Sequence, residues 1–237
     1  MNEAIILAGG LGTRLSSVVT DVPKPLAPVQ GRPALSYVLD QISLSGVNRV
    51  ILAVAYKHEL IEAFYGDSYK GMALTYSVEE TPLGTGGGLM KAACLIEGEY
   101  FLACNADTLL SKDYRALSTS SLERRASTLL VMKERHATRF GAVAYKKTGK
   151  VVAFNDSVTP DVSSEISHGI SVGSYVFNIA HLKNCAPPSS LFSLEDYLLP
   201  QLCKRSLLFA QEYSGLFIDI GVPDDYFLAQ NTRELKG

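Results

Sequence analysis

The chain has 237 residues, with 22 lysine and arginine side chains against 24 aspartates and glutamates, so its formal net charge is -2. This balance argues against a nucleic-acid-binding protein, which usually has a basic face, and against a polybasic membrane-surface protein. The four cysteines have no Cys-x-x-Cys spacing, and a chain of this length can bury a core without disulfides.

Short apolar runs alternate with amphipathic stretches through the first half of the chain. Strands are predicted at Ile5–Ala8, Arg49–Ala55, Ala73–Val78, Tyr100–Cys104 and Ser127–Met132, and helices at Pro33–Leu44, Glu59–Tyr65, Leu89–Ile96 and Asp113–Arg125. This alternation predicts an α/β fold, with a mostly parallel sheet covered by helices on both faces. Ligands bind such sheets beyond the carboxyl ends of the strands.

The second half of the chain has a different pattern. Strands are predicted at Gly141–Tyr145, Val151–Phe154, Gly169–Phe177, Leu207–Ala210 and Leu216–Ile218, and helices at Leu194–Lys204 and Pro223–Leu235. The hairpin-like spacing of the first three strands predicts a small antiparallel appendage within one domain, residues 1–237.

The start of the chain and its apolar runs bear on localisation. Residues 1–8 have no basic stretch before the apolar one, so they do not resemble a signal peptide. No apolar run reaches the roughly 18 residues of a membrane span. We therefore expect a cytoplasmic protein without a membrane partner.

A glycine loop, Gly9-Gly10-Leu11-Gly12-Thr13-Arg14, follows the first predicted strand. Glycines allow the backbone to approach an anion closely and to direct several N–H groups at it. The spacing matches neither the Rossmann G-x-G-x-x-G pattern nor a Walker A loop, and a tight turn without a ligand stays an alternative. Arg14 favours the phosphate-binding interpretation, because its planar guanidinium suits phosphate oxygens.

Lys24 lies between two prolines, Pro23 and Pro25. A residue that precedes proline is restricted to extended geometry, so we expect Lys24 on a rigid, non-helical arm. Such an arm would hold the ammonium as a point charge for a phosphate. A surface turn is the alternative.

Two aspartates, Asp107 and Asp219, each follow an apolar run. Carboxylates at strand ends suit Mg²⁺, which takes a few oxygens from the protein and completes its shell with water and substrate phosphate. Either aspartate alone is more often a turn former or a helix cap. The prediction of a magnesium site therefore depends on folding to bring the two together.

A third loop spans residues 79–88 and begins with Glu79 and Glu80. It follows a strand and opens a helix, but two glutamates would repel a phosphate, so we assign the loop to a nucleobase or a sugar. The carboxylate of Glu79 can accept hydrogen bonds from the adjacent N–H and NH₂ donors of guanine, a pair that thymine and uracil do not present. Exposed solubilising glutamates are the alternative.

Together these motifs resemble the sugar-1-phosphate nucleotidyltransferases. The family signature is G-G-x-G-T-R-L after a strand, then P-K-P, and it stands here as residues 9–15 with residues 23–25. The L-G-T-G-G loop matches Leu83–Gly87, and the two metal-binding aspartates match Asp107 and Asp219. Residues 51–57 and 76–80 are similar to the D-glycero-α-D-manno-heptose 1-phosphate guanylyltransferases within this family.

The resemblance implies a three-layer α/β/α, Rossmann-like (GT-A-like) fold. It implies that residues 1–132 mainly bind the nucleotide and that residues 133–237 mainly bind the sugar. It also implies a Mg²⁺-dependent single displacement, in which the sugar phosphate attacks the α-phosphorus of a nucleoside triphosphate. The implied nucleotide-binding residues are Leu7, Ala8, Gly9, Gly10, Gly12, Thr13, Arg14, Glu79, Gly84 and Asp107; the catalytic residues are Arg14, Lys24 and Asp107; the metal ligands are Asp107 and Asp219.

The sugar side departs from the family pattern. Many relatives carry Glu-Lys-Pro where this chain reads Asn155-Asp156-Ser157, and N-x-G-x-Y where it reads Ser171-Val172-Gly173-Ser174-Tyr175. The candidate sugar-binding residues are Gly141, Asn155, Gly173 and Glu195. Arg135, His136 and Arg139 are candidates to replace the missing lysine, with a solvated basic run as the alternative. His168 has no assigned role.

The resemblance favours GTP and D-glycero-α-D-manno-heptose 1-phosphate as substrates. Mannose 1-phosphate with GTP, glucose 1-phosphate with dTTP, and an amino-sugar 1-phosphate with UTP remain open. A non-catalytic regulatory subunit would be expected to lack Arg14, Lys24 or the metal aspartates, all of which are present. The oligomeric state is open, a homodimer included.

Overall fold

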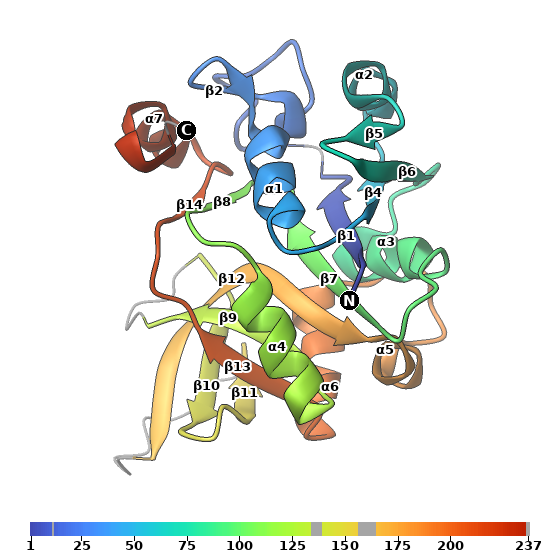
Figure 1. Cartoon of the computed structure of the whole chain (residues 1–237), viewed down its shortest axis with the longest axis vertical. Coiled ribbons are helices and arrows are strands. Elements are labelled where there is room, and N and C mark those ends of the chain that lie inside the picture. The colour runs from blue at the N-terminus through green and yellow to red at the C-terminus, as the bar shows by residue number, and fades with distance from the viewer. Residues whose placement is uncertain (11, 134–138, 156–164, 236–237) are drawn as a thin grey trace.

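The computed structural model describes residues 1–10, 12–133, 139–155 and 165–235. Its main feature is a ten-stranded mixed sheet in which eight strands follow the order β11-β10-β12-β7-β1-β4-β6-β5, while β9 pairs with β12 and β13 (Figure 1). The three-layer α/β/α fold class predicted from the sequence is confirmed. Within the described residues, no helix has the length and apolar character needed to cross a membrane.

The first half of the chain builds the parallel part of this sheet. Strand β1 (Glu3–Ala8) pairs in parallel with β4 (Arg49–Val54) and with β7 (Tyr100–Asn105), and β4 pairs in parallel with β6 (Met72–Val78). The connecting helices are α1 (Ala34–Ser43), α2 (His58–Tyr65) and α3 (Gly84–Ala93). These strands are rich in Val, Ile, Leu and Ala because both of their faces are buried.

The second half of the chain adds antiparallel strands to the same sheet. The long strand β12 (Ile166–Asn178) enters between β7 and β9 (Ser127–Met132) and is antiparallel to both. Its first half pairs with β10 (Ala142–Lys146), which in turn pairs with β11 (Val151–Phe154). The predicted antiparallel appendage is therefore continuous with the main sheet through β12, which is drawn in light orange in Figure 1.

Several short strands complete the structure. They are β2 (Pro28–Val29), β3 (Arg32–Pro33), β5 (Ser68–Tyr69), β8 (Thr108–Leu110), β13 (Leu208–Glu212) and β14 (Phe217–Asp219). Strand β13 runs parallel to β9, and β14 pairs with β8 in a small separate ladder.

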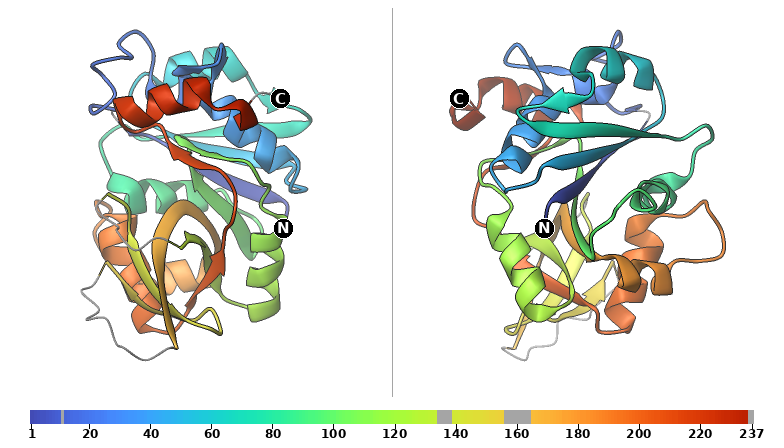
Figure 2. Two further views of the ribbon diagram at one scale, coloured as in Figure 1. Left: turned by 90° about the vertical axis from the view of Figure 1, so that its left-hand side faces the viewer. Right: turned by 45° about the vertical axis from the view of Figure 1, so that its right-hand side comes forward.

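Helices cover both faces of the sheet, as predicted (Figure 2). Alternate residues of β1 divide between two hydrophobic clusters, with Ala4 and Ile6 in one and Ile5 in the other. The first cluster packs under α1, α2, α4 (Arg115–Arg124) and α7 (Pro223–Asn231). The second packs under α3, α5 (Ile179–Cys185) and α6 (Leu199–Lys204).

Helix α3 differs from the sequence-based prediction, since it begins at Gly84 and not at Leu89. The glycines were expected to precede the helix, but they form its first turns. A β-carbon at Gly86 would overlap the ring of Phe192, and one at Gly87 would overlap the carbonyl oxygen of Ser190. Close packing, which a pattern of side chains does not reveal, selects glycine inside this helix.

Other differences lie in the last third of the chain. Helix α5 was not predicted, and the expected helix over Leu194–Lys204 opens with the π-helical turn Leu194–Leu198 before α6. The expected helix Pro223–Leu235 ends at Asn231, and a 3-10 turn at Arg233–Leu235 follows it.

Candidate active site

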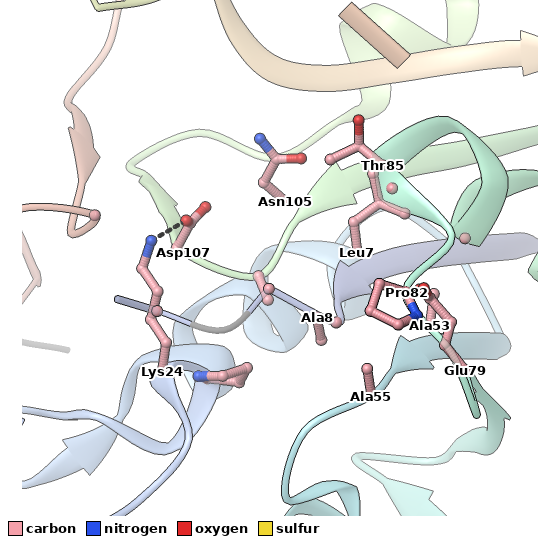
Figure 3. Close-up of a pocket in the computed structure, with 18 of the residues that line it drawn as sticks. Leu7, Ala8, Lys24, Ala53, Ala55, Glu79, Pro82, Thr85, Asn105 and Asp107 are labelled. Carbon is pink, nitrogen blue, oxygen red and sulfur yellow. Dashed lines mark hydrogen bonds and ion pairs between the residues drawn. The ribbon is translucent and has the colours of Figure 1, made fainter. Parts of the chain in front are cut away.

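A cavity of about 460 Å³ lies at the carboxyl ends of β1, β4 and β7 (Figure 3). All ten residues predicted to contact the nucleotide line it, and so does Lys24. The further lining residues are Pro25, Ala53, Ala55, Pro82, Thr85, Gly88, Asn105, Ala106 and Gly221. The position agrees with the rule that α/β sheets bind ligands beyond the carboxyl ends of their strands.

The glycine loop packs directly against charged side chains of this cavity. A β-carbon at Gly9 would lie 2.9 Å from Oε1 of Glu79, and one at Gly12 would lie 3.2 Å from Cβ of Lys24. Gly12 also has a φ of +64°, in the left-handed region that favours glycine. Arg14 follows in an exposed turn and lines the cavity. The loop thus runs along the cavity from Glu79 at Gly9 to Lys24 at Gly12.

Lys24 was predicted on an extended arm, but it opens the 3-10 turn Lys24–Leu26. Pro23 and Pro25 are buried, so the backbone on each side of Lys24 is packed in the fold. The Lys24 ammonium donates a hydrogen bond to Oδ2 of Asp107, and the two side chains are 12% and 26% exposed. The rigid attachment is as expected, although its conformation is not.

The pairing of β8 with β14 brings the two predicted metal ligands together. Asp219 pairs with Thr108, the residue after Asp107, and the Ile220 N–H donates to the carbonyl of Asp107 at 3.1 Å. Oδ1 of Asp219 accepts a hydrogen bond of 2.6 Å from the N–H of Gly221. Burial, and next the negative charge of Asp107, raise the pKa of Asp219, although Lys24 counteracts this.

These two carboxylates fit a magnesium ion. Among the described residues, no group of three or more His, Cys, Asp or Glu side chains is arranged to hold a metal. Mg²⁺ does not require such a group, since one or two carboxylates with substrate phosphates and water are its usual ligands. Asp107, which lines the cavity, and Asp219, on the strand paired beside it, provide this smaller set.

Glu79 marks the opposite end of the cavity, beside Ala53, Ala55 and Pro82 (Figure 3). Its Oε2 accepts a hydrogen bond of 3.0 Å from the N–H of Leu83. Its Oε1 lies against the α-carbons of Gly9 and Gly88. A carboxylate among small apolar residues provides one strong acceptor in an apolar environment, which suits a heterocycle with adjacent N–H donors.

None of the four predicted sugar-binding residues lines this cavity. Gly173 has a φ of +69°, and a β-carbon there would overlap the amide of Asn105. Glu195 accepts a hydrogen bond of 2.8 Å from Oγ1 of Thr85. Both residues therefore border the cavity through a lining residue, Asn105 or Thr85.

The other two sugar-side candidates lie together at the end of the β10–β11 hairpin. A β-carbon at Gly141 would be 3.4 Å from Oδ1 of Asn155, and this oxygen accepts a hydrogen bond of 3.1 Å from the Ala142 N–H. Both positions are set by the hairpin, and neither is among the described residues that line the cavity.

Three basic residues were candidates to replace the missing lysine, and the structure describes one of them, Arg139. Arg139 donates to Asp225 in α7 and lies 4.9 Å from the ring centroid of Phe140. Arg135 and His136 lie outside the described residues. His168 is exposed near the start of β12. Arg139 also lies near Asp219, and its positive charge partly lowers the pKa of that carboxyl group.

Sequence reasoning missed several lining residues, among them Asn105, Thr85 and Gly221. Asn105 stands two residues before Asp107 at the same strand end, and Gly221 stands two residues after Asp219. Proximity to a predicted ligand at a strand end was therefore an available signal for both. Thr85 lies inside the L-G-T-G-G loop itself, so the motif already contained it.

The cavity lies where α/β proteins bind ligands, and a comparison with known families identifies the class of protein. A family model described as nucleotidyl transferase matches residues 3–235. The chain belongs to this nucleotidyl transferase family.

Two known proteins and one solved structure are similar to this chain over nearly its full length. The chain is 37% identical over 235 residues to a D-glycero-alpha-D-manno-heptose 1-phosphate guanylyltransferase of Aneurinibacillus thermoaerophilus, with 99% of this chain and 98% of that protein covered. It is 33% identical to the enzyme of the same name from Campylobacter jejuni, with coverage of 95% and 97%. A crystal structure of HddC from Yersinia pseudotuberculosis complexed with GMP-PN has a TM-score of 0.75 and 30% identity, covering 97% of this chain and 98% of that one.

Proposed function

We propose that this chain transfers a guanylyl group from GTP to D-glycero-α-D-manno-heptose 1-phosphate and releases pyrophosphate. The observation that carries the proposal is the nearly full-length similarity to two guanylyltransferases of that name. The cavity supports it, since a carboxylate stands at one end and a cluster of two carboxylates and an ammonium stands at the other.

The base would lie at the Glu79 end. Oε2 of Glu79 is already fixed by the Leu83 N–H, so the carboxylate is oriented before a ligand arrives. A carboxylate has about four acceptor positions, and those that remain can take the N1–H and N2–H donors of guanine. The small residues Ala53 and Ala55 leave room for the ring plane.

The phosphates would lie along the glycine loop. Its N–H groups and the guanidinium of Arg14 would hold the triphosphate and the departing pyrophosphate, and Lys24 would neutralise the α-phosphate and the attacking sugar phosphate. Asp107 and Asp219 would hold Mg²⁺, which when bound supplies further positive charge at the α-phosphate.

The reaction needs no general base on the protein. An ionised oxygen of the sugar phosphate attacks the α-phosphorus, and the bond from the α-phosphorus to the bridging oxygen breaks. Pyrophosphate leaves with that electron pair. The protein contributes by positioning the two phosphates and by neutralising their charges.

The sugar would lie on the β12 side of the cavity, over Asn105 and Gly173. Asn105 makes no side-chain hydrogen bond within the described part of the chain, so its amide is free for a hydroxyl. Glu195 borders the same region through Thr85. We assign Gly141 and Asn155 to the outer edge of this subsite, and so residues 133–237 mainly to the sugar.

The test is a pyrophosphate-release panel that crosses GTP, ATP, UTP and dTTP with the heptose, mannose and glucose 1-phosphates. GTP with the heptose phosphate is expected to give the highest kcat/KM. Glu79→Gln should reduce the preference for GTP over UTP, whereas Glu80→Gln, its exposed neighbour outside the cavity, should not. A wild-type enzyme that uses dTTP or UTP as well as GTP would refute the base assignment, and mannose 1-phosphate as the best acceptor would refute the sugar assignment.

A further inference from the structure

Lys24 makes a contact that a phosphate-binding lysine does not need. Its ammonium pairs with Asp107, the residue proposed to hold the metal (Figure 3). A β-carbon at Gly221 would lie 3.1 Å from Nζ of Lys24 and 2.6 Å from Oδ1 of Asp219. The ammonium and the carboxylate of Asp219 therefore both lie beside Gly221, while Asp107 pairs with the ammonium.

The path of the lysine stem shows that this position is built into the fold. Gly12 packs against Cβ of Lys24, and both flanking prolines are buried. The ammonium is thereby directed at Asp107 by the glycine loop on one side and by Gly221 on the other. Only 12% of the side chain is exposed, so water screens the ion pair less than at an open surface.

The Lys24 ammonium and a divalent ion would compete for the carboxylate of Asp107. A divalent ion that enters between Asp107 and Asp219 would meet the ammonium there, and like charges at such short range repel strongly. The ammonium can leave only if another anion receives it. The glycine loop is where the phosphates of the nucleotide would supply that anion.

We propose that the Lys24 ammonium occupies the place of the metal in the nucleotide-free enzyme, and that the metal enters only when nucleotide phosphates draw this ammonium away from Asp107. Lys24 then has two successive partners, Asp107 before binding and phosphate after it. While no ligand is bound, the positive charge of Lys24 offsets the negative charge of the neighbouring carboxylates. The inference rests on the proposed function for the assignment of Asp107 and Asp219 as metal ligands.

The first test measures Mn²⁺ binding without any nucleotide, by electron paramagnetic resonance of the free ion. Mn²⁺ takes the same kind of oxygen ligands as Mg²⁺. Lys24→Met should bind Mn²⁺ at least about tenfold more tightly than wild type. Arg14→Met is the matched control, because it removes one positive charge from the same cavity but leaves the pair of Lys24 with Asp107 intact.

Two results would overturn the inference. One is a Lys24→Met protein that binds Mn²⁺ no more tightly than Arg14→Met. The other is tighter binding that survives the added Asp107→Asn change, since the gain would then arise elsewhere. Neither result depends on GTP or on a sugar phosphate, so both are separate from failure of the pyrophosphate-release panel.

A second test uses the wild-type protein and so does not depend on the folding of a variant. Acetylation of Lys24 by acetic anhydride, followed by peptide mass spectrometry, is compared with that of exposed Lys146. Mg²⁺ without nucleotide should leave the rate for Lys24 relative to Lys146 unchanged, even at a concentration that saturates the Lys24→Met variant, because the ammonium stays paired with Asp107. A relative rate that rises with Mg²⁺ alone would contradict the proposal, since the metal would then displace the ammonium without any phosphate.

Discussion

The carboxylate of Glu79 lies directly against the α-carbon of Gly88, so that a β-carbon at position 88 would overlap Oε1. Gly88 belongs to α3, while Glu79 follows the end of β6. The missing side chain at Gly88 thus creates the space in which the proposed base-recognising group rests. This contact makes Gly88 a test of the role of Glu79 that does not alter the carboxylate itself.

Gly88→Ala is expected to displace the Glu79 carboxylate and to raise the KM for GTP by about tenfold. The overlapping atom is the far end of a flexible side chain, so the fold can absorb the change and the Tm should stay close to that of wild type. Steady-state kinetics with varied GTP and with varied sugar phosphate separate the two substrates. If the effect acts through Glu79, Gly88→Ala combined with Glu79→Gln will cost little more than Glu79→Gln alone.

Gly87→Ala should behave differently, although the two glycines are adjacent in the same helix. The added β-carbon would overlap the carbonyl oxygen of Ser190, which is backbone and cannot rotate away. We expect a loss of about 2 kcal/mol in the free energy of unfolding, typical of overpacking. Urea unfolding measures the free energy of unfolding of both variants. Equal values for Gly87→Ala and Gly88→Ala would show that the backbone around Ser190 can move to accommodate the added β-carbon.

The glycine loop and the flanking prolines of Lys24 could be predicted from the sequence because both are local motifs. The approach of Asp219 to Asp107 could not, since it depends on the short ladder between β14 and β8, over 100 residues apart in the chain. The insertion of β12 between β7 and β9 is non-local in the same way. Helix α3 was misjudged at its start because the reason for its glycines is Phe192 and Ser190, far along the chain.

Asp219→Asn should stabilise the protein without metal while it abolishes activity. Burial, and then the charge of Asp107, raise the pKa of Asp219, so its ionised form costs free energy in the folded state. An amide keeps the hydrogen bond from the Gly221 N–H but removes the charge. Thermal unfolding in EDTA at neutral pH should give a higher Tm for the variant.

The raised pKa of Asp219 also determines how the difference in stability between wild type and Asp219→Asn varies with pH. A carboxyl group with a raised folded-state pKa becomes protonated first in the folded protein as the pH falls. Once Asp219 is protonated, wild type no longer bears the free-energy cost of its buried charge. The excess of the Tm of Asp219→Asn over that of wild type should therefore shrink toward acid pH. A variant that is less stable than wild type at neutral pH would contradict the argument.

Asp40 is expected to show the opposite pH dependence. It lies in α1 and accepts from Arg32 at 2.7 Å and from the Tyr69 hydroxyl at 2.9 Å, while Lys70 lies 2.7 Å away. Burial alone would raise the pKa of Asp40, but these partners together hold it below its usual value. The ionised carboxylate therefore stabilises the fold at neutral pH.

This contribution is fully present above the pKa of the unfolded chain, and it is lost as the pH falls through the lower folded-state pKa. Asp40→Asn should lower the Tm at neutral pH, and the difference from wild type should narrow in acid. Asp67→Asn, at an exposed position outside this network, is the control and should leave the Tm nearly unchanged. Melting curves of wild type, Asp40→Asn and Asp67→Asn from neutral to acid pH give the Tm differences. A Tm difference for Asp40→Asn that stayed constant at every pH would show that lost packing, and not the carboxylate charge, is responsible.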